Sequence, residues 1–147
     1  MTQKRVGILI FRDVEVLDFC GPFEVFSAVR LNEEKRREET SPFEVVLIAE
    51  TREPIVATGG LRVIPDFTLE DCPPLHILVV PGGWGTRTEI SNHKLLHWIR
   101  SWGPKVEVLS SVCTGSALLG TAGLLNGRHA TTHWKAIPWV RELLPDV

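Results

Sequence analysis

Four short apolar segments constrain the fold of this chain more than any other feature. Each reads as a run of apolar residues rather than as a polar–apolar alternation, and such strands are typical of parallel sheets that are buried on both faces. The segments are residues 5–11, 43–49, 76–80 and 105–110. We predict that they are the strands of one sheet.

Segments with helical spacing of apolar residues alternate with these strands. They are residues 18–30, 88–102, 116–125 and 134–144. Alternating strands and helices with short connections predict a doubly wound, mostly parallel α/β sheet sandwiched by helices, which is the flavodoxin-like arrangement. The mixed-charge run at residues 33–39 is interpreted as a solvated helix end or loop.

Three connecting segments have weaker patterns. The Gly59-Gly60 pair within residues 54–65 predicts a β-hairpin with a two-residue turn. Residues 66–74 are interpreted as a polar connection with a short helix, and residues 128–132 as a short strand.

Composition narrows the class of protein. With 147 residues, 44% of them hydrophobic and 23% charged, the chain is expected to be one soluble globular domain over residues 1–147. A net charge of -2 gives no electrostatic reason to expect nucleic acid or an anionic membrane as partner. No secretion signal or membrane-length apolar run is present, so a cytoplasmic location is expected.

The three cysteines are Cys20, Cys72 and Cys113, an odd number at wide spacing, which argues against a disulfide framework. The absence of a Cys-x-x-Cys pair argues against a structural zinc site. We interpret Cys20 as a helix packing residue and Cys72 as incidental.

Residues 111–115, Ser-Val-Cys-Thr-Gly, lie between a predicted strand and a predicted helix. A nucleophile between small residues at such a turn is the pattern of a nucleophile elbow. The following helix N-terminus is expected to favour the thiolate of Cys113. The alternative is a small buried thiol in the core, and we favour the nucleophile.

Other polar groups are predicted at the same sheet edge, because ligands of such sheets bind beyond the carboxyl ends of the strands. Asp18 is either a first-turn helix carboxylate or a carboxyl beside Cys113 that acts as general acid or base. Gly82 and Gly83 form either a flexible turn or, with the Thr114 N–H joining that of Gly83, an oxyanion hole.

Side chains near the elbow have two interpretations each. The Thr114 hydroxyl donates to a substrate or caps the helix, and His133 orients the thiol or caps the next helix. His129 is expected at the surface, and His93 and His97 on a solvated helix face.

Five stretches together resemble the ThiJ/PfpI superfamily, also called class I glutamine amidotransferase-like. They are residues 6–11, 17–25, 79–83, 111–115 and 123–134. The resemblance is strongest to the isonitrile hydratase branch and to the sensor domains of AraC-type regulators. It implies Cys113 as nucleophile, Asp18 as its acidic neighbour, Thr114 as the residue after the hydratase cysteine and Gly83 as the oxyanion position.

The chain departs from the family pattern in two places, and the resemblance implies two further expectations. PfpI-type proteases have histidine where this chain has Thr114, which argues against peptidase activity, and the late His-x-Glu pair of amidotransferases is absent. The family domain normally continues with further strands and a helix, so the closing C-terminal elements are expected to be missing here. Family members are commonly homodimers, and the resemblance implies a homodimer.

The leading functional hypothesis is a cysteine-dependent hydratase (a lyase) that converts a small isonitrile into an N-substituted formamide. It needs neither a metal nor an organic cofactor. One alternative is a ligand-sensing domain related to AraC-type transcription regulators. Another is a redox or carbonyl-stress protein of the superfamily, glyoxalase-like in activity.

Overall fold

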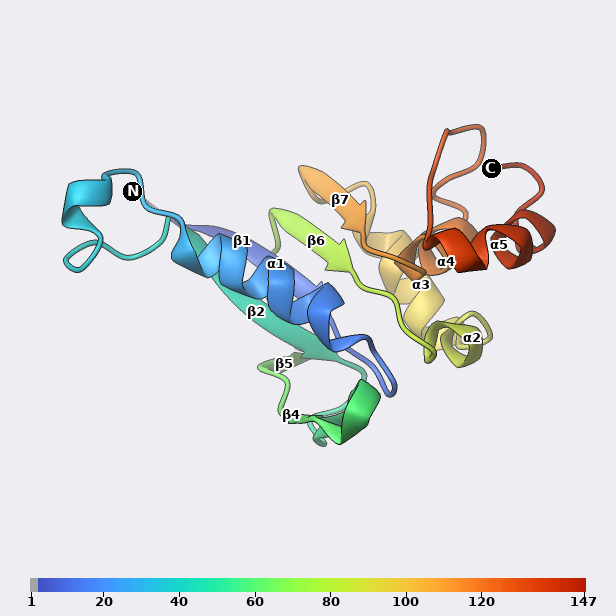
Figure 1. Ribbon diagram of the computed structural model, residues 1–147, viewed down its shortest axis with the longest axis horizontal. Helices are drawn as coiled ribbons and strands as arrows, with labels where there is room; N and C mark the ends of the chain where they lie inside the picture. Colours follow the sequence, from blue (N-terminus) through green and yellow to red (C-terminus); the bar gives the residue numbers. More distant parts are fainter. Residues whose placement is uncertain (1–2) are drawn as a thin grey trace.

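A five-stranded parallel sheet organises the protein, and we describe residues 3–147 from a computed structural model (Figure 1). The strand order is β5-β2-β1-β6-β7, and every neighbouring pair is parallel. The strands are β1 (Lys4–Leu9), β2 (Phe43–Ala49), β5 (Phe67–Thr68), β6 (Ile77–Val80) and β7 (Val108–Ser111). The predicted α/β fold with a parallel sheet flanked by helices is confirmed.

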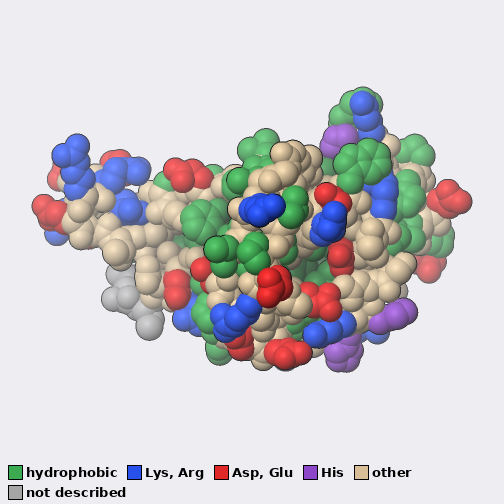
Figure 2. All heavy atoms as spheres, turned by 90° about the horizontal axis from the view of Figure 1, so that it is seen from below, with side chains coloured by type: hydrophobic (Ala, Val, Ile, Leu, Met, Phe, Trp, Pro, Cys, Tyr) green, Lys and Arg blue, Asp and Glu red, His purple; other side chains and the backbone are tan. Residues whose placement is uncertain are grey.

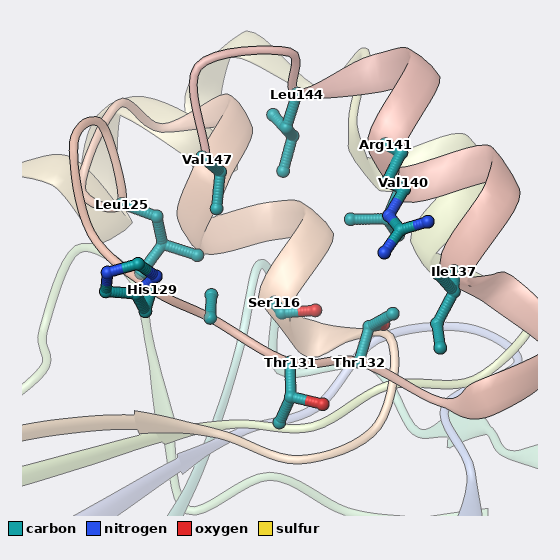
Figure 3. Close-up of a pocket in the computed structure, with 11 residues that line it drawn as sticks. Ser116, Leu125, His129, Thr131, Thr132, Ile137, Val140, Arg141, Leu144 and Val147 are labelled. Carbon is teal, nitrogen blue, oxygen red and sulfur yellow. The ribbon is translucent and has the colours of Figure 1, made fainter.

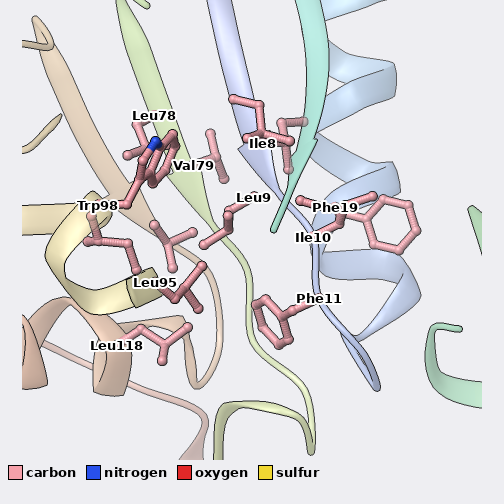
Figure 4. Close-up of a cluster of buried hydrophobic side chains, with 14 of the residues drawn as sticks. Ile8, Leu9, Ile10, Phe11, Phe19, Leu78, Val79, Leu95, Trp98 and Leu118 are labelled. Carbon is pink, nitrogen blue, oxygen red and sulfur yellow. The ribbon is translucent and has the colours of Figure 1, made fainter. Parts of the chain in front are cut away.

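The core explains why the central strands lack alternation. In β1 both faces are covered, so that Val6, Ile8 and Leu9 are all fully buried. Helix α1 (Val16–Ala28) packs against β1 and β2, and α4 (Gly115–Thr121) packs against β6 and β7. Figure 4 shows side chains of helices and strands meeting in this cluster. Each large apolar side chain buried there contributes about 1.5–3 kcal/mol.

The predicted helix over residues 88–102 is two helices in the structure. They are α2 (Thr86–Glu89) and α3 (His93–Trp102). Asn92 separates them, because its side-chain oxygen accepts a hydrogen bond from the Leu95 N–H at 3.1 Å and caps α3. The last predicted helix begins as a 3₁₀ turn, η3 (Trp134–Ala136), and continues as α5 (Ile137–Leu143).

The predicted hairpin is present, but its two-residue turn is wrong. Strands β3 (Ile55–Val56) and β4 (Arg62–Val63) pair antiparallel with Val56 opposite Arg62. This register leaves residues 57–61 as a loop, which contains the 3₁₀ turn η2 (Thr58–Gly60).

Two further local predictions are wrong. Residues 66–74 contain strand β5 rather than a short helix. Residues 128–132, expected to be a strand, have no regular structure.

The charged run is exposed, as predicted. Residues 31–40 are exposed throughout and include the 3₁₀ turn η1 (Glu33–Lys35). Figure 2 shows side chains of both charges gathered at the end of the molecule where this segment projects. In the part of the chain that the structure describes, no helix is long and apolar enough to cross a membrane.

Candidate active site

Cys113 stands at a strained turn between β7 and α4. Its φ is 54°, in the left-handed region, where a residue with a side chain loses about 1–2 kcal/mol relative to its usual conformation. The turn is closed by the Gly115 N–H, which donates to the Val112 carbonyl at 2.9 Å. This is the predicted strand–turn–helix geometry of an elbow, and backbone strain of this kind is concentrated at functional sites.

Glycines let the end of β6 approach this turn. A Cβ atom on Gly82 would lie 2.5 Å from the Thr114 nitrogen, and one on Gly115 would lie 2.0 Å from the Val80 carbonyl oxygen. Both distances are shorter than non-bonded atoms tolerate. The two loops therefore meet backbone to backbone only because these positions have no side chain.

Asp18 is buried beside Cys113. Its side chain is 8% exposed, and its Oδ2 accepts a hydrogen bond from the Gly82 N–H at 3.1 Å. The carboxyl lies close enough to Cys113 to raise the pKa of the thiol. The structure thus brings Asp18, Gly82 and Cys113 together from three separate elements. Asp18 is also a first-turn carboxylate of α1, so both interpretations of this residue describe its position.

The environment of Cys113 raises the pKa of its thiol. Burial raises the pKa of the Cys113 thiol above its ordinary value, and the charge and hydrogen bond of Asp18 raise it further. The Thr114 N–H and hydroxyl act in the opposite direction but do not outweigh these effects. The prediction that the helix N-terminus favours a thiolate is therefore wrong. Burial and the neighbouring carboxyl both favour the neutral thiol.

Thr114 connects the elbow to the loop after β6. The Gly83 N–H donates to Thr114 Oγ1 at 3.0 Å, and the hydroxyl of Thr86 lies 3.1 Å from the same oxygen. Thr86 is fully buried and also donates to the Gly83 carbonyl at 2.8 Å. The Thr114 hydroxyl makes no capping bond in α4.

These contacts affect the predicted oxyanion hole. The Gly83 N–H is already satisfied by the Thr114 hydroxyl, and the Gly82 N–H by Asp18. The Thr114 N–H lowers the pKa of the Cys113 thiol, which places it near the sulfur. An oxyanion would reach Gly83 only by displacing the Thr114 hydroxyl, so the role of Gly83 stays a prediction.

The sulfur opens into a pocket of about 490 Å³, a size common for small-molecule sites. The pocket brings together five residues that the sequence singled out and six that it did not. The residues lining the pocket are Glu15, Leu17, Asp18, Gly83, Trp84, Arg87, Cys113, Thr114, His133, Lys135 and Ala136.

His133 lies at the rim of this pocket and caps η3. Its Nδ1 accepts from the Lys135 N–H at 3.3 Å, and its ring stacks on Trp134. Among residues 3–147 no hydrogen bond joins His133 to Cys113. His93, His97 and His129 are exposed, as expected. No cluster of three or more potential metal ligands occurs within these described residues.

Several residues of this pocket have no distinguishing pattern in the sequence. Trp84 and Arg87 closely follow Gly83 in the sequence, so the rule that ligands bind beyond strand ends could have been applied to them as well. Glu15 and Lys135 flank residues that were singled out, but nothing in their local pattern distinguishes them from surface charges.

The two other cysteines lie outside this pocket. Cys20 is exposed on α1, so its interpretation as a packing residue is wrong. Cys72 is half-buried, and burial raises its pKa to about 11.

A second pocket of about 320 Å³ lies between α4, α5 and residues 125–132 (Figure 3). Figure 3 shows Leu125, Leu144 and Val147 around this space and Ser116 at its floor. This pocket adjoins the backbone of Cys113 rather than its sulfur. The hydroxyls of Ser116 and Thr132, which line the pocket, each donate to the Cys113 carbonyl at 3.3 Å. The chemistry-bearing groups converge in the first pocket instead.

Comparison with known proteins gives consistent results. The sequence model of the DJ-1/PfpI family matches residues 4–142. A Pseudomonas putida protein named isonitrile hydratase is 37% identical over 143 residues, which are 97% of this chain and 56% of that protein. The HTH-type transcriptional regulator CdhR of Pseudomonas aeruginosa is 34% identical over 94 residues, 64% of this chain and 28% of the regulator.

Among solved structures, a ThiJ/PfpI family protein from Pseudomonas syringae superposes with a TM-score of 0.84 at 28% identity. The match covers 97% of this chain and 55% of that one. The chain thus spans about half the length of these relatives.

Proposed function

Since this chain belongs to the DJ-1/PfpI family, we propose that it is a cysteine-dependent hydratase that converts a small isonitrile into an N-substituted formamide. The observation that supports this most is the buried Asp18 carboxyl, which lies near enough to the Cys113 thiol to raise its pKa in an open pocket. Similarity to the isonitrile hydratase of Pseudomonas putida supports the choice of substrate class.

The proposed reaction needs a sulfur nucleophile and a proton at neighbouring positions. The terminal carbon of R–N≡C forms a bond to the Cys113 sulfur while the proton held between Cys113 and Asp18 moves to that carbon. The product is a thioimidate, R–N=CH–S. No oxidant or reductant is involved.

Water then adds to the thioimidate carbon, and the Asp18 carboxyl takes its proton. The carbon–sulfur bond breaks, the nitrogen gains a proton, and R–NH–CHO leaves. The sulfur and the carboxyl regain the one proton they shared. The raised pKa of Cys113 suits this sequence, because the reaction requires the thiol proton as well as the sulfur.

Turnover of an aromatic isonitrile, with chromatographic detection of the formamide, tests the proposal. Cys113→Ala is expected to abolish formamide production, and Asp18→Asn to lower kcat by about 100-fold or more, the range of a lost general acid–base. Cys20→Ser and Cys72→Ser are matched controls and should retain activity, since both thiols lie outside the pocket. Full activity in Cys113→Ala would exclude this mechanism.

A ligand-sensing role is the second candidate, favoured by the similarity to the regulator CdhR. A sensor would bind small molecules in the Cys113 pocket without consuming them. Calorimetric binding of an isonitrile by the wild type with no formamide formed would favour the sensor over the hydratase.

We also propose that the chain forms a homodimer. Its α1 presents Leu17, Phe23 and Val25 to solvent, which supports a contact between two copies at this helix. Sedimentation of the wild type beside Val25→Glu measures this, with a shift toward the monomer expected in the variant.

A further inference from the structure

Arg87 is fixed between two aromatic rings at the pocket wall. Its guanidinium carbon lies 4.1 Å from the ring centre of Trp84 and 4.6 Å from that of Trp139. Trp84 belongs to the loop after β6, Arg87 to α2 and Trp139 to α5. Two cation–π contacts from separate elements restrict a long side chain that would otherwise lose entropy on binding a ligand.

The charge of Arg87 has no acidic partner. Between residues 3 and 147, no Asp or Glu lies within ion-pair distance of its guanidinium, and its N–H groups donate no hydrogen bond to the protein. Arg5 and Arg36, in contrast, are each bound to a glutamate. Contacts with the ring faces leave the N–H donors at the guanidinium edge free, and these suit a planar carboxylate.

The free cation lines the pocket of the proposed nucleophile. Arg87 and Lys135 both line the space into which Cys113 opens, and the exposed indole of Trp84 adds an apolar wall beside them. The acids of the same pocket are Glu15 and Asp18. An anionic group is therefore stabilised on the Arg87 and Lys135 side, and repelled on the side of the two carboxyls.

We propose that Arg87 is a specificity residue that binds a carboxylate on the substrate, so that the preferred substrate is an anionic isonitrile with a flat apolar body. This rests on the proposed hydratase function. The Arg87 edge takes the carboxylate, Trp84 contacts the body, and the isonitrile carbon meets Cys113. Lys135 adds a second positive charge without the same fixed geometry.

The test compares two isonitriles that differ only in charge, para-isocyanobenzoate and its methyl ester. For the wild type, kcat/KM is expected to be about 10-fold or more higher for the acid, the range of a charged hydrogen bond. Arg87→Met should lower kcat/KM for the acid by roughly 10- to 100-fold and leave the ester nearly unchanged. Arg141→Gln, an exposed arginine of α5 outside this pocket, is the matched control.

A purely structural role of Arg87, tying α2 to α5, predicts a different result. Arg87→Met would then lower kcat/KM of the acid and the ester by the same factor, and this outcome would overturn the proposal. Arg87→Lys separates charge from shape, because it keeps the charge but loses the planar fork, and an intermediate preference for the acid is expected.

If neither isonitrile is turned over, the hydratase function is refuted, but the role of Arg87 is not. A binding measurement then tests the role of Arg87 by itself. Calorimetry with para-formamidobenzoate and its methyl ester should give a Kd about 10-fold or more lower for the acid in the wild type, and equal values in Arg87→Met. Equal Kd values for acid and ester in the wild type would refute the role of Arg87.

Discussion

The left-handed conformation of Cys113 predicts an unusual order of stability among its variants. With φ at 54°, Cys113→Gly should be more stable than Cys113→Ala, although alanine is normally the better residue. Both variants lose the sulfur and its contact with Asp18, so these losses cancel in the comparison. Ser116 is buried inside α4 and provides the matched control. At this position Ser116→Ala should be more stable than Ser116→Gly.

The magnitudes follow from the two environments. At position 113 alanine bears about 1–2 kcal/mol of left-handed strain. Glycine loses about 0.5–1 kcal/mol through chain entropy. It also loses the stabilisation from one half-buried methyl group, about 0.4 kcal/mol. The net advantage of glycine is roughly 0.5 kcal/mol. At position 116 helix propensity and methyl burial both favour alanine, by about 2 kcal/mol together.

Urea denaturation of the four variants measures both differences. The Gly-minus-Ala difference in the free energy of unfolding should have opposite signs at the two positions, and the two differences should lie about 2.5 kcal/mol apart. The contrary outcome is that Cys113→Ala is more stable than Cys113→Gly by as much as Ser116→Ala is more stable than Ser116→Gly. The cysteine would then not occupy a left-handed turn, and the elbow geometry would be refuted.

Three further predictions concern the groups around the sulfur. Thr86→Val removes a fully buried hydroxyl that holds Thr114 and should cost about 1 kcal/mol in urea denaturation, while equal stability would deny the hydroxyl network. Gly115→Ala places a Cβ 2.0 Å from a backbone oxygen and should cost about 3 kcal/mol or more, so a stable variant would contradict the close approach of the two loops. Burial and Asp18 raise the pKa of Cys113, so its alkylation by iodoacetamide in a variant lacking the other cysteines should keep accelerating above the ordinary thiol pKa. Asp18→Asn should move this acceleration to lower pH. An unchanged pH profile would show that the Asp18 carboxyl does not affect the pKa of Cys113.

The same shift affects stability as pH rises. The pKa of Cys113 is higher in the folded protein than in the unfolded chain, because burial and Asp18 favour the neutral thiol. The stabilisation is therefore complete below the ordinary thiol pKa and is lost as pH rises through the folded value.

The sheet could be predicted because burial on both faces dictates composition. The side chains of Val6, Ile8 and Leu9 are all shielded from solvent. The unbroken apolar run of β1 is therefore enough to identify it as a strand buried on both faces. The convergence of Asp18 and Gly82 on Cys113 followed from one rule, that parallel strands end at the same edge.

What the sequence could not provide depends on distant contacts. The pKa of Cys113 follows from burial and from Asp18, and neither is visible in the local elbow pattern. The hydroxyl of Thr86 and the ring of Trp139 matter only because α2 and α5 meet the same loop. Loop length in the β3–β4 hairpin was missed because the Gly59-Gly60 pair lies within a longer turn.

Mass spectrometry of the acid-quenched protein tests the central claim most directly. During turnover of an isonitrile, the peptide that contains Cys113 should gain the full mass of one isonitrile molecule, and this adduct should vanish once the substrate is consumed. Cys113→Ala should form neither adduct nor formamide. Formamide produced by Cys113→Ala at the wild-type rate, with no adduct on the wild-type peptide, would contradict the account.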